Sequence, residues 1–239
     1  ACSFWSVTQP ATPAQKIIVA LDVPTEADAL KLIDTLGDTV RFYKIGLQLF
    51  TKCGPAFVQR VKATGARVFL DLKFLDIPNT VQHAVRSACE IGVDMMTIHL
   101  CGGGKMIAAA VAGAGDDPAL ILGVTVLTSS SRETLQETGV HGAVEDQVLR
   151  LAKLGVENGI RGVVASPQEI SLLRQVFGKG LAIVTPGVRP EWAAANDQQR
   201  TLTPQAAVGA GADYLVIGRP ITAHANPAEA ARMIADEIG

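Results

Sequence analysis

Excess charge of one sign, aromatic side chains and long apolar runs are all scarce in this chain of 239 residues. The formal net charge is −2, and aromatic residues make up 5% of the sequence. Nucleic-acid binding would need a local basic patch, and the sequence shows none. No apolar run approaches the roughly 18 to 20 residues of a membrane-spanning helix, and the first fifteen residues lack both a basic start and a sustained apolar stretch. We therefore expect a cytoplasmic protein with small-molecule partners, no nucleic acid and no membrane.

Cysteine pairs with metal-site spacing are also absent. The cysteines are Cys2, Cys53, Cys89 and Cys101, and no two of them form a Cys-x-x-Cys pair. This pattern favours reduced, buried or incidental thiols over disulfides or a zinc site. The histidines show no ligand spacing either, so we expect no metal.

What the chain does have is enough apolar sequence, 48% of its residues, to bury a substantial core. Short β-rich runs occur at 17–21, 41–45, 67–72, 95–99, 120–126, 162–165, 181–185 and 214–217. Amphipathic or Ala-rich stretches lie between them at 26–36, 55–63, 81–91, 146–158, 167–176, 204–210 and 227–238. This alternation predicts an α/β fold, a (β/α)8 TIM barrel.

An open doubly wound sheet is the alternative fold. It would more often carry a glycine-rich dinucleotide turn after its first strand, and residues 20–24 contain no glycine. No linker or break in composition divides the chain, so we expect a single barrel domain over residues 16–239 after an N-terminal extension, residues 1–15. Gly65, Gly92, Gly159 and Gly211 are expected to close one helix before the next strand begins.

Charged residues occur where the first three predicted strands end. The two-residue period of a strand sends Phe69, Asp71 and Lys73 to one face. Asp22 closes the first strand, and Lys44 lies on the second. Because catalytic groups of such barrels lie at the carboxyl ends of the strands, we expect these charges at one mouth. A structural ion pair between Asp71 and Lys73 is the alternative reading.

The end of the chain predicts a phosphate site. Gly218 and Arg219 follow the eighth strand, and Arg189 follows the seventh, where barrels often hold phosphate. The loop 186–204 is polar and long for a connection of this kind, which suggests a lid. The glycine run at 101–105 lacks the spacing of a phosphate-binding loop, so we interpret it as a turn before a helix.

Two further positions have structural explanations on spacing alone. Asn79 or Thr80 is available as the N-cap of the third helix, because the Ile77-Pro78 step forces an extended approach. His99, at the end of the fourth strand, is expected to be a hydrogen-bonded histidine at the rim of the barrel rather than an acid or base.

The core Asp-x-Lys-x-x-Asp-x-x-x-Thr at 71–80, with Lys44 upstream and the motifs at 185–190, 197–198 and 217–220, resembles the bacterial type of orotidine 5′-phosphate decarboxylase. The resemblance runs from about residue 17 to residue 227. It implies a homodimeric barrel that converts orotidine 5′-phosphate to UMP and CO2 in pyrimidine biosynthesis, without metal or organic cofactor.

The resemblance also implies roles for single residues. Lys73 would donate a proton to C6, flanked by Asp71 and Lys44, while Asp76 and Thr80 would complete the neighbouring subunit's site. The remaining contacts to substrate would come from Asp22, Lys44, Thr128, Arg189, Gln198, Gly218 and Arg219. Leu75 departs from the family pattern, since many bacterial relatives carry histidine there, and we expect a changed contact rather than lost activity.

Two other functions stay open on the sequence. A Mg²⁺-dependent sugar-phosphate decarboxylase or aldolase on the same barrel would share the Asp-x-Lys-x-x-Asp motif. Lys44 argues against it, because an ammonium at that place would repel a metal ion. A catalytically silent phosphate-binding barrel is the other alternative, and the intact Lys73 argues against that.

Overall fold

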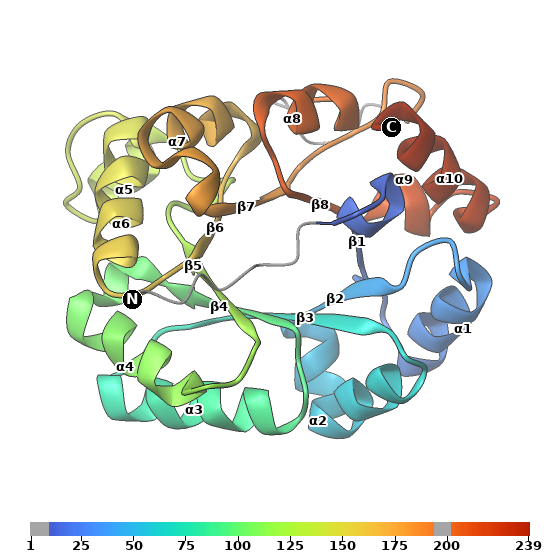
Figure 1. The fold of residues 1–239 in the computed structure, drawn as a ribbon, viewed down its shortest axis with the longest axis horizontal. Coiled ribbons are helices and arrows are strands. Elements are labelled where there is room, and N and C mark those ends of the chain that lie inside the picture. Colours follow the sequence, from blue (N-terminus) through green and yellow to red (C-terminus); the bar gives the residue numbers. More distant parts are fainter. Residues whose placement is uncertain (1–9, 194–201) are drawn as a thin grey trace.

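Eight parallel strands close into a barrel, with helices around the outside, in the computed structural model of the chain (Figure 1). The structure describes residues 10–193 and 202–239. Each strand pairs with the next along the chain, and β8 pairs with β1. The strands are β1 (Ile17–Ala20), β2 (Phe42–Gly46), β3 (Arg67–Phe74), β4 (Met95–His99), β5 (Leu120–Val124), β6 (Gly162–Val164), β7 (Ala182–Pro186) and β8 (Tyr214–Ile217). The predicted single-domain TIM barrel is confirmed.

Most helices lie where the sequence pattern predicts, some with other boundaries, whereas the short helix at 132–137 was not predicted. Within the described residues they are α1 (Glu26–Leu36), α2 (Leu47–Ala63), α3 (Pro78–Glu90), α4 (Gly104–Ala114), α5 (Arg132–Glu137), α6 (Val144–Glu157), α7 (Ile170–Phe177), α8 (Pro204–Ala210), α9 (Arg219–Thr222) and α10 (Pro227–Glu237). The stretch predicted from Pro55 forms the second part of α2, and the helical residues before it, from Leu47, were not predicted. The helix begins at Leu47 and continues across a kink at Gly54, whose φ of 66° only glycine adopts readily.

The start of α3 also differs from the expectation. Neither Asn79 nor Thr80 is its N-cap: Ile77 holds that position without a side-chain hydrogen bond, and Pro78 is the first helical residue. Proline suits this place because its missing N–H would be unpaired there in any case.

Apolar side chains fill both sides of the barrel wall. The larger cluster lies between the strands and the helices, and a smaller one fills the barrel interior. The interior cluster consists of Ile18, Ala20, Phe42, Phe69, Met95, Leu122, Val184, Tyr214 and Val216. Because side chains alternate along a strand, the residues two steps beyond Phe42 and Phe69, which are Lys44 and Asp71, point into the same interior nearer the carboxyl ends.

The glycines expected to close helices do so. Gly65, Gly92, Gly159 and Gly211 have φ values of 79°, 80°, 93° and 112°, in the left-handed region. At Gly211 a side chain would also meet Arg174 at 2.8 Å. These turns return the chain to the strand layer.

At the amino ends of β4 and β8, an aspartate carboxylate makes the same pair of contacts, one to a neighbouring strand and one to a basic side chain on a helix. Asp94 directly precedes β4, and its carboxylate accepts hydrogen bonds from the Val68 N–H and from Lys62 Nζ, both at 2.7 Å. Asp213 directly precedes β8, where it accepts the Ile183 N–H at 2.7 Å and pairs with Arg174. Each carboxylate therefore ties a helix to two neighbouring strands.

The described part of the N-terminal extension, the cysteines and the helix lengths can be compared with the expectations from the sequence. The 3₁₀ turn Pro13–Lys16 packs against α10, β1 and β8, and residues 1–9 of the predicted extension lie outside the described residues, as does Cys2. Cys53, Cys89 and Cys101 are free thiols. Across residues 10–193 and 202–239, no helix has both the length and the apolarity to cross a bilayer.

Candidate active site

A bulge near the end of β3 shapes the site. Leu70 pairs with Met96 and Phe74 pairs with Ile98, so three residues of β3 stand opposite Thr97 alone. Lys73 has a φ of 52°, and it is the only described residue other than glycine with a positive φ. Bulges often re-aim side chains next to active sites, and a non-glycine residue in this region stores backbone strain. Asp71 and Lys73 thus both face the cavity, as the alternation predicts, but an irregular backbone puts Lys73 there.

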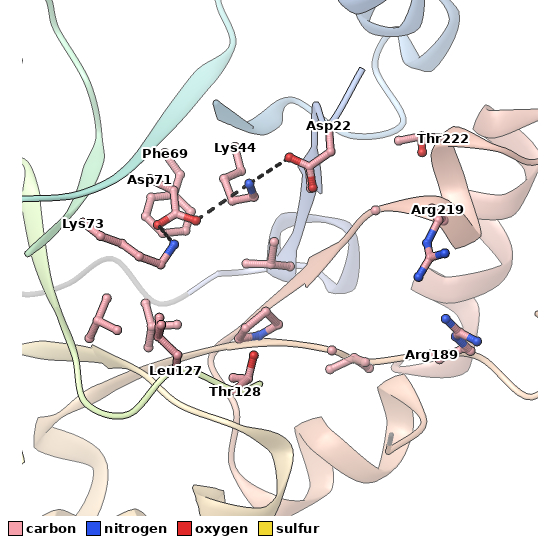
Figure 2. Close-up of a pocket in the computed structure, with 18 of the residues that line it drawn as sticks. Asp22, Lys44, Phe69, Asp71, Lys73, Leu127, Thr128, Arg189, Arg219 and Thr222 are labelled. Carbon is pink, nitrogen blue, oxygen red and sulfur yellow. Dashed lines mark hydrogen bonds and ion pairs between the residues drawn. The ribbon is translucent and has the colours of Figure 1, made fainter. Parts of the chain in front are cut away.

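Two ammonium groups and two carboxylates alternate at the mouth of the barrel (Figure 2). Lys73 Nζ lies 2.8 Å from Asp71 Oδ1. Lys44 Nζ lies 3.7 Å from Asp71 Oδ2 and 3.1 Å from Asp22 Oδ1. The Lys44 and Asp71 side chains are only 12% and 14% exposed, so water and salt screen their interaction weakly.

These charges occupy one end of a cavity of about 460 Å³. Arg189 and Arg219 point their guanidinium groups toward one another at the other end, away from Lys73, and Thr128 lies on the side opposite Lys44 (Figure 2). The predicted site residues that line the cavity are Asp22, Lys44, Asp71, Lys73, Thr128, Arg189, Gly218 and Arg219. The structure thus brings together residues from the ends of β1, β2, β3, β5, β7 and β8.

Asp76 and Thr80 do not line this cavity. Both are exposed: Asp76 lies between β3 and α3, where its Oδ1 accepts the Ile77 N–H at 2.6 Å, and Thr80 lies in the first turn of α3. Their predicted place is the site of a second subunit, and the single chain leaves that prediction untested.

The loop predicted as a lid begins within the described residues. The Arg189 N–H donates to the Leu202 carbonyl at 3.0 Å, which joins the two ends of the loop. Gln198 lies outside the described residues, as does the rest of the segment 194–201 of the predicted lid.

His99 ends β4 close to the charged groups. Burial lowers the pKa of His99, the Lys73 ammonium lowers it further, and Asp71 opposes both effects. The predicted hydrogen bond to its ring is not found within the part of the chain that the structure describes.

The sequence reasoning did not single out three residues that shape this site. Thr97 hydrogen-bonds to both Asp71 and Lys73. Gly46 lies against the Lys44 ammonium, and Thr222 lines the cavity beside Arg219 (Figure 2). A signal for Thr97 was present, because it is a polar residue in the otherwise apolar run 95–98 and shares a face with His99.

Comparison with known proteins identifies the family. The model of the orotidine 5′-phosphate decarboxylase / HUMPS family matches residues 15–234. The chain belongs to this family. The orotidine 5′-phosphate decarboxylase family that the motifs resemble is therefore confirmed, and the match spans the whole barrel.

Relatives in this family are similar over nearly their full length. The orotidine 5′-phosphate decarboxylase of Syntrophotalea carbinolica is 51% identical over 231 residues, covering 94% of this chain and 95% of that protein. That of Geobacter sulfurreducens is 51% identical over 229 residues, covering 94% and 96%. A crystal structure of orotidine 5′-phosphate decarboxylase from Lactobacillus acidophilus superposes with a TM-score of 0.84 at 36% identity, covering 94% of this chain and 99% of that one.

Proposed function

We propose that the protein decarboxylates orotidine 5′-phosphate to UMP and CO2 in pyrimidine biosynthesis, in the cytoplasm as its composition predicts, with Lys73 as the proton donor. Full-length relatives about 50% identical carry the name of this activity. The observation that carries the proposal is an ammonium, Lys73 Nζ, held 2.8 Å from the Asp71 carboxylate in a cavity whose far end holds two arginines.

Decarboxylation places negative charge on C6, and a cation fixed next to C6 can stabilise it. The bond between C6 and the carboxylate breaks, CO2 leaves, and the electron pair stays on C6 in an orbital that the ring does not delocalise. An ammonium placed at C6 stabilises this charge electrostatically and then supplies the proton that forms the C6–H bond. Lys73 becomes neutral and regains a proton from water. The ion pair with Asp71 holds the amine in place before the reaction.

The rest of the cavity provides contacts to the other parts of the nucleotide. The end of the cavity formed by Arg189, Arg219 and the Gly218 backbone suits a phosphate. A single guanidinium group can donate two parallel hydrogen bonds to two phosphate oxygens. Asp22 and Lys44 suit the ribose hydroxyls, and Thr128 suits the pyrimidine edge. Gln198 is proposed to contact the phosphate end as well, on the resemblance alone. Binding energy at the phosphate then aligns the ring over Lys73.

A second copy of the chain is proposed to complete each site. Leu75 and Ile77 are 52% and 66% exposed, and they flank Asp76 on the connection between β3 and α3. Exposed apolar side chains around a carboxylate suit an interface better than open solvent. In a symmetric dimer, Asp76 and Thr80 would reach the partner's Lys73.

Complementation tests the shared site. Lys73→Ala and Asp76→Asn are each expected to be nearly inactive as pure proteins. When the two are unfolded together and refolded as a mixture, half of the dimers are mixed, and each mixed dimer has one intact site, so activity returns to roughly a quarter of wild type. A mixture as inactive as its components would contradict the shared site.

A spectrophotometric assay with orotidine 5′-phosphate in the presence of EDTA tests the activity. We expect turnover by the wild type and by Lys105→Ala, which removes an exposed lysine on α4, and a loss of at least about 100-fold in Lys73→Ala. Retained decarboxylation in Lys73→Ala would contradict the mechanism. UMP binding by Lys73→Ala shows that the loss is chemical and not a failure to fold.

The Mg²⁺-dependent alternative gives a different result in the same assay. A metal there would need the oxygens of Asp22 and Asp71, both of which the Lys44 ammonium contacts. Turnover of a keto-sugar phosphate that stops on chelation would favour this alternative and would contradict the proposal. Binding of UMP without turnover by the wild type would favour the silent phosphate-binding barrel.

A further inference from the structure

The Thr97 hydroxyl lies at the centre of the bulge in β3. It accepts the Lys73 backbone N–H at 2.9 Å and donates to Asp71 Oδ1 at 3.0 Å. Asp71 Oδ1 in turn accepts Lys73 Nζ at 2.8 Å. These three hydrogen bonds form a closed ring that ties the backbone of Lys73 to its own side chain through Thr97 and Asp71.

We propose that Thr97 is a positioning residue for decarboxylation, one that holds Lys73 and Asp71 in the reactive geometry through its hydroxyl. The inference rests on the proposed role of Lys73 as the proton donor. Thr97 does not line the cavity, so it acts through the two charged residues and not on the substrate.

The bulge explains why a hydroxyl is needed at this position. Thr97 is the single residue of β4 opposite the three bulged residues of β3, Asp71 to Lys73, and the Lys73 N–H donates to its side chain. The acceptor Thr97 is 0% exposed and the hydrogen bond is part-buried, so a Lys73 N–H left without a partner here would be costly. The hydroxyl therefore supplies an acceptor for the Lys73 N–H where the register between β3 and β4 is interrupted.

The left-handed conformation of Lys73 strengthens the argument. A residue with a φ of 52° stays there only when its surroundings over-determine it. With the Lys73 N–H on one lone pair of Thr97 Oγ1, the hydroxyl proton is directed to Asp71. Backbone and carboxylate are thus fixed by one group.

Four variants test the proposal. Thr97→Val keeps the shape and removes the hydroxyl, Thr97→Ala removes it without bulk, and Thr97→Ser restores it. Thr185→Val is the matched control, because Thr185 is also 0% exposed but its hydroxyl makes no hydrogen bond within the described residues. All four are compared with wild type for kcat, KM and UMP affinity.

We expect kcat to fall by about 10- to 100-fold in Thr97→Val and Thr97→Ala, because a small misplacement of a reacting group has effects of this size. KM and UMP affinity should change by less than about threefold, since the contacts to the nucleotide remain. Thr97→Ser and Thr185→Val should stay within about threefold of wild type. Thr97→Val or Thr97→Ala with wild-type kcat, or Thr97→Ser as slow as either, would overturn the proposal.

A crystal structure of Thr97→Ala separates this inference from the proposed function. We expect the Lys73 backbone to leave the left-handed region, or Lys73 Nζ to move out of contact with Asp71. An unchanged bulge and ion pair would overturn the positioning role whatever the enzyme's substrate is. If the wild type fails to decarboxylate orotidine 5′-phosphate, the proposed function is overturned. The structure of Thr97→Ala would still show whether Thr97 positions Lys73 and Asp71.

Discussion

Gly46 lies directly beside the end of the Lys44 side chain: a Cβ at Gly46 would lie 2.9 Å from Lys44 Nζ, so the ammonium would have to move. Gly46 ends β2, two residues after Lys44, and so faces the same side of the strand. Its φ is −95°, so the backbone itself would accept alanine. The absence of a side chain at position 46 is what lets Lys44 reach both Asp22 and Asp71.

Gly46→Ala should therefore weaken nucleotide binding by displacing Lys44. We expect UMP affinity to fall and KM to rise by about tenfold, with little change in the free energy of unfolding. Titration calorimetry with UMP measures the effect. Gly180→Ala is the control, because a Cβ at Gly180 meets no atom within 4 Å. Equal UMP affinities in the two variants would contradict the steric explanation.

Arg219→Ala should lower kcat/KM by about 100-fold or more, since a planar guanidinium makes two charge-assisted hydrogen bonds to a phosphate. The decisive comparison is between UMP and uridine. The wild type should bind UMP much more tightly, and the variant should lose most of this preference. Arg232→Ala, an exposed arginine on α10, is the control and should keep it. An undiminished preference for UMP in Arg219→Ala would place the phosphate elsewhere.

Thr185→Val should stabilise the protein. The Thr185 hydroxyl is buried without a hydrogen-bond partner among the described residues, and a buried polar group in that state costs free energy. Valine has nearly the same shape, so the free energy of unfolding should rise by about 1 kcal/mol. Urea denaturation measures the change. A fall of the same size would show that the hydroxyl has a partner in solution.

The buried carboxyl group of Glu169 should make the free energy of unfolding depend on pH. Burial raises the pKa of Glu169 from 4.5 to about 7, although the Ser166 N–H donates to its carboxylate at 2.8 Å and lowers the pKa; Glu145 raises it further. Between these two pH values the folded state binds more protons than the unfolded state. The contribution of Glu169 to stability is therefore present below about pH 4.5 and is lost as the pH rises through 7.

Glu169→Gln removes this titration, and its amide oxygen can still accept the Ser166 N–H. We expect the variant to be more stable than wild type by about 1 to 3 kcal/mol at pH 8, and most of the difference to vanish at pH 5. Chemical denaturation at the two pH values gives the comparison. A difference independent of pH would show that Glu169 does not titrate in this range.

The architecture of the site could be predicted from the sequence because it depends on local patterns. Strand periodicity is enough to put Asp71 on the face of Phe69, and the end of a parallel strand is enough to bring Asp22 and Lys44 to the same mouth. The glycine and arginine after β8 were informative for the same reason. Each of these inferences needs only neighbours in the sequence.

The bulge, the role of Thr97 and the steric limit at Gly46 were not predicted. The bulge exists between two strands, and its consequence for Lys73 depends on a hydroxyl 24 residues away in the chain. The start of α3 was misjudged because Asn79 and Thr80 are good capping residues, whereas Pro78 can begin a helix without a cap. In each case a spatial neighbour or a competing local preference decided the outcome.

The carboxylates that precede β4 and β8 stabilise the fold at one end of the barrel, whereas the reacting groups lie at the other end. Asp94 and Asp213 fasten helices to strands at the end of the barrel remote from the reacting groups. Heat tolerance can consequently be adjusted by substitutions around these two anchors while the opposite rim is left untouched. Substitutions at this end would thus change the temperature at which the protein unfolds while the residues that contact the substrate stay the same.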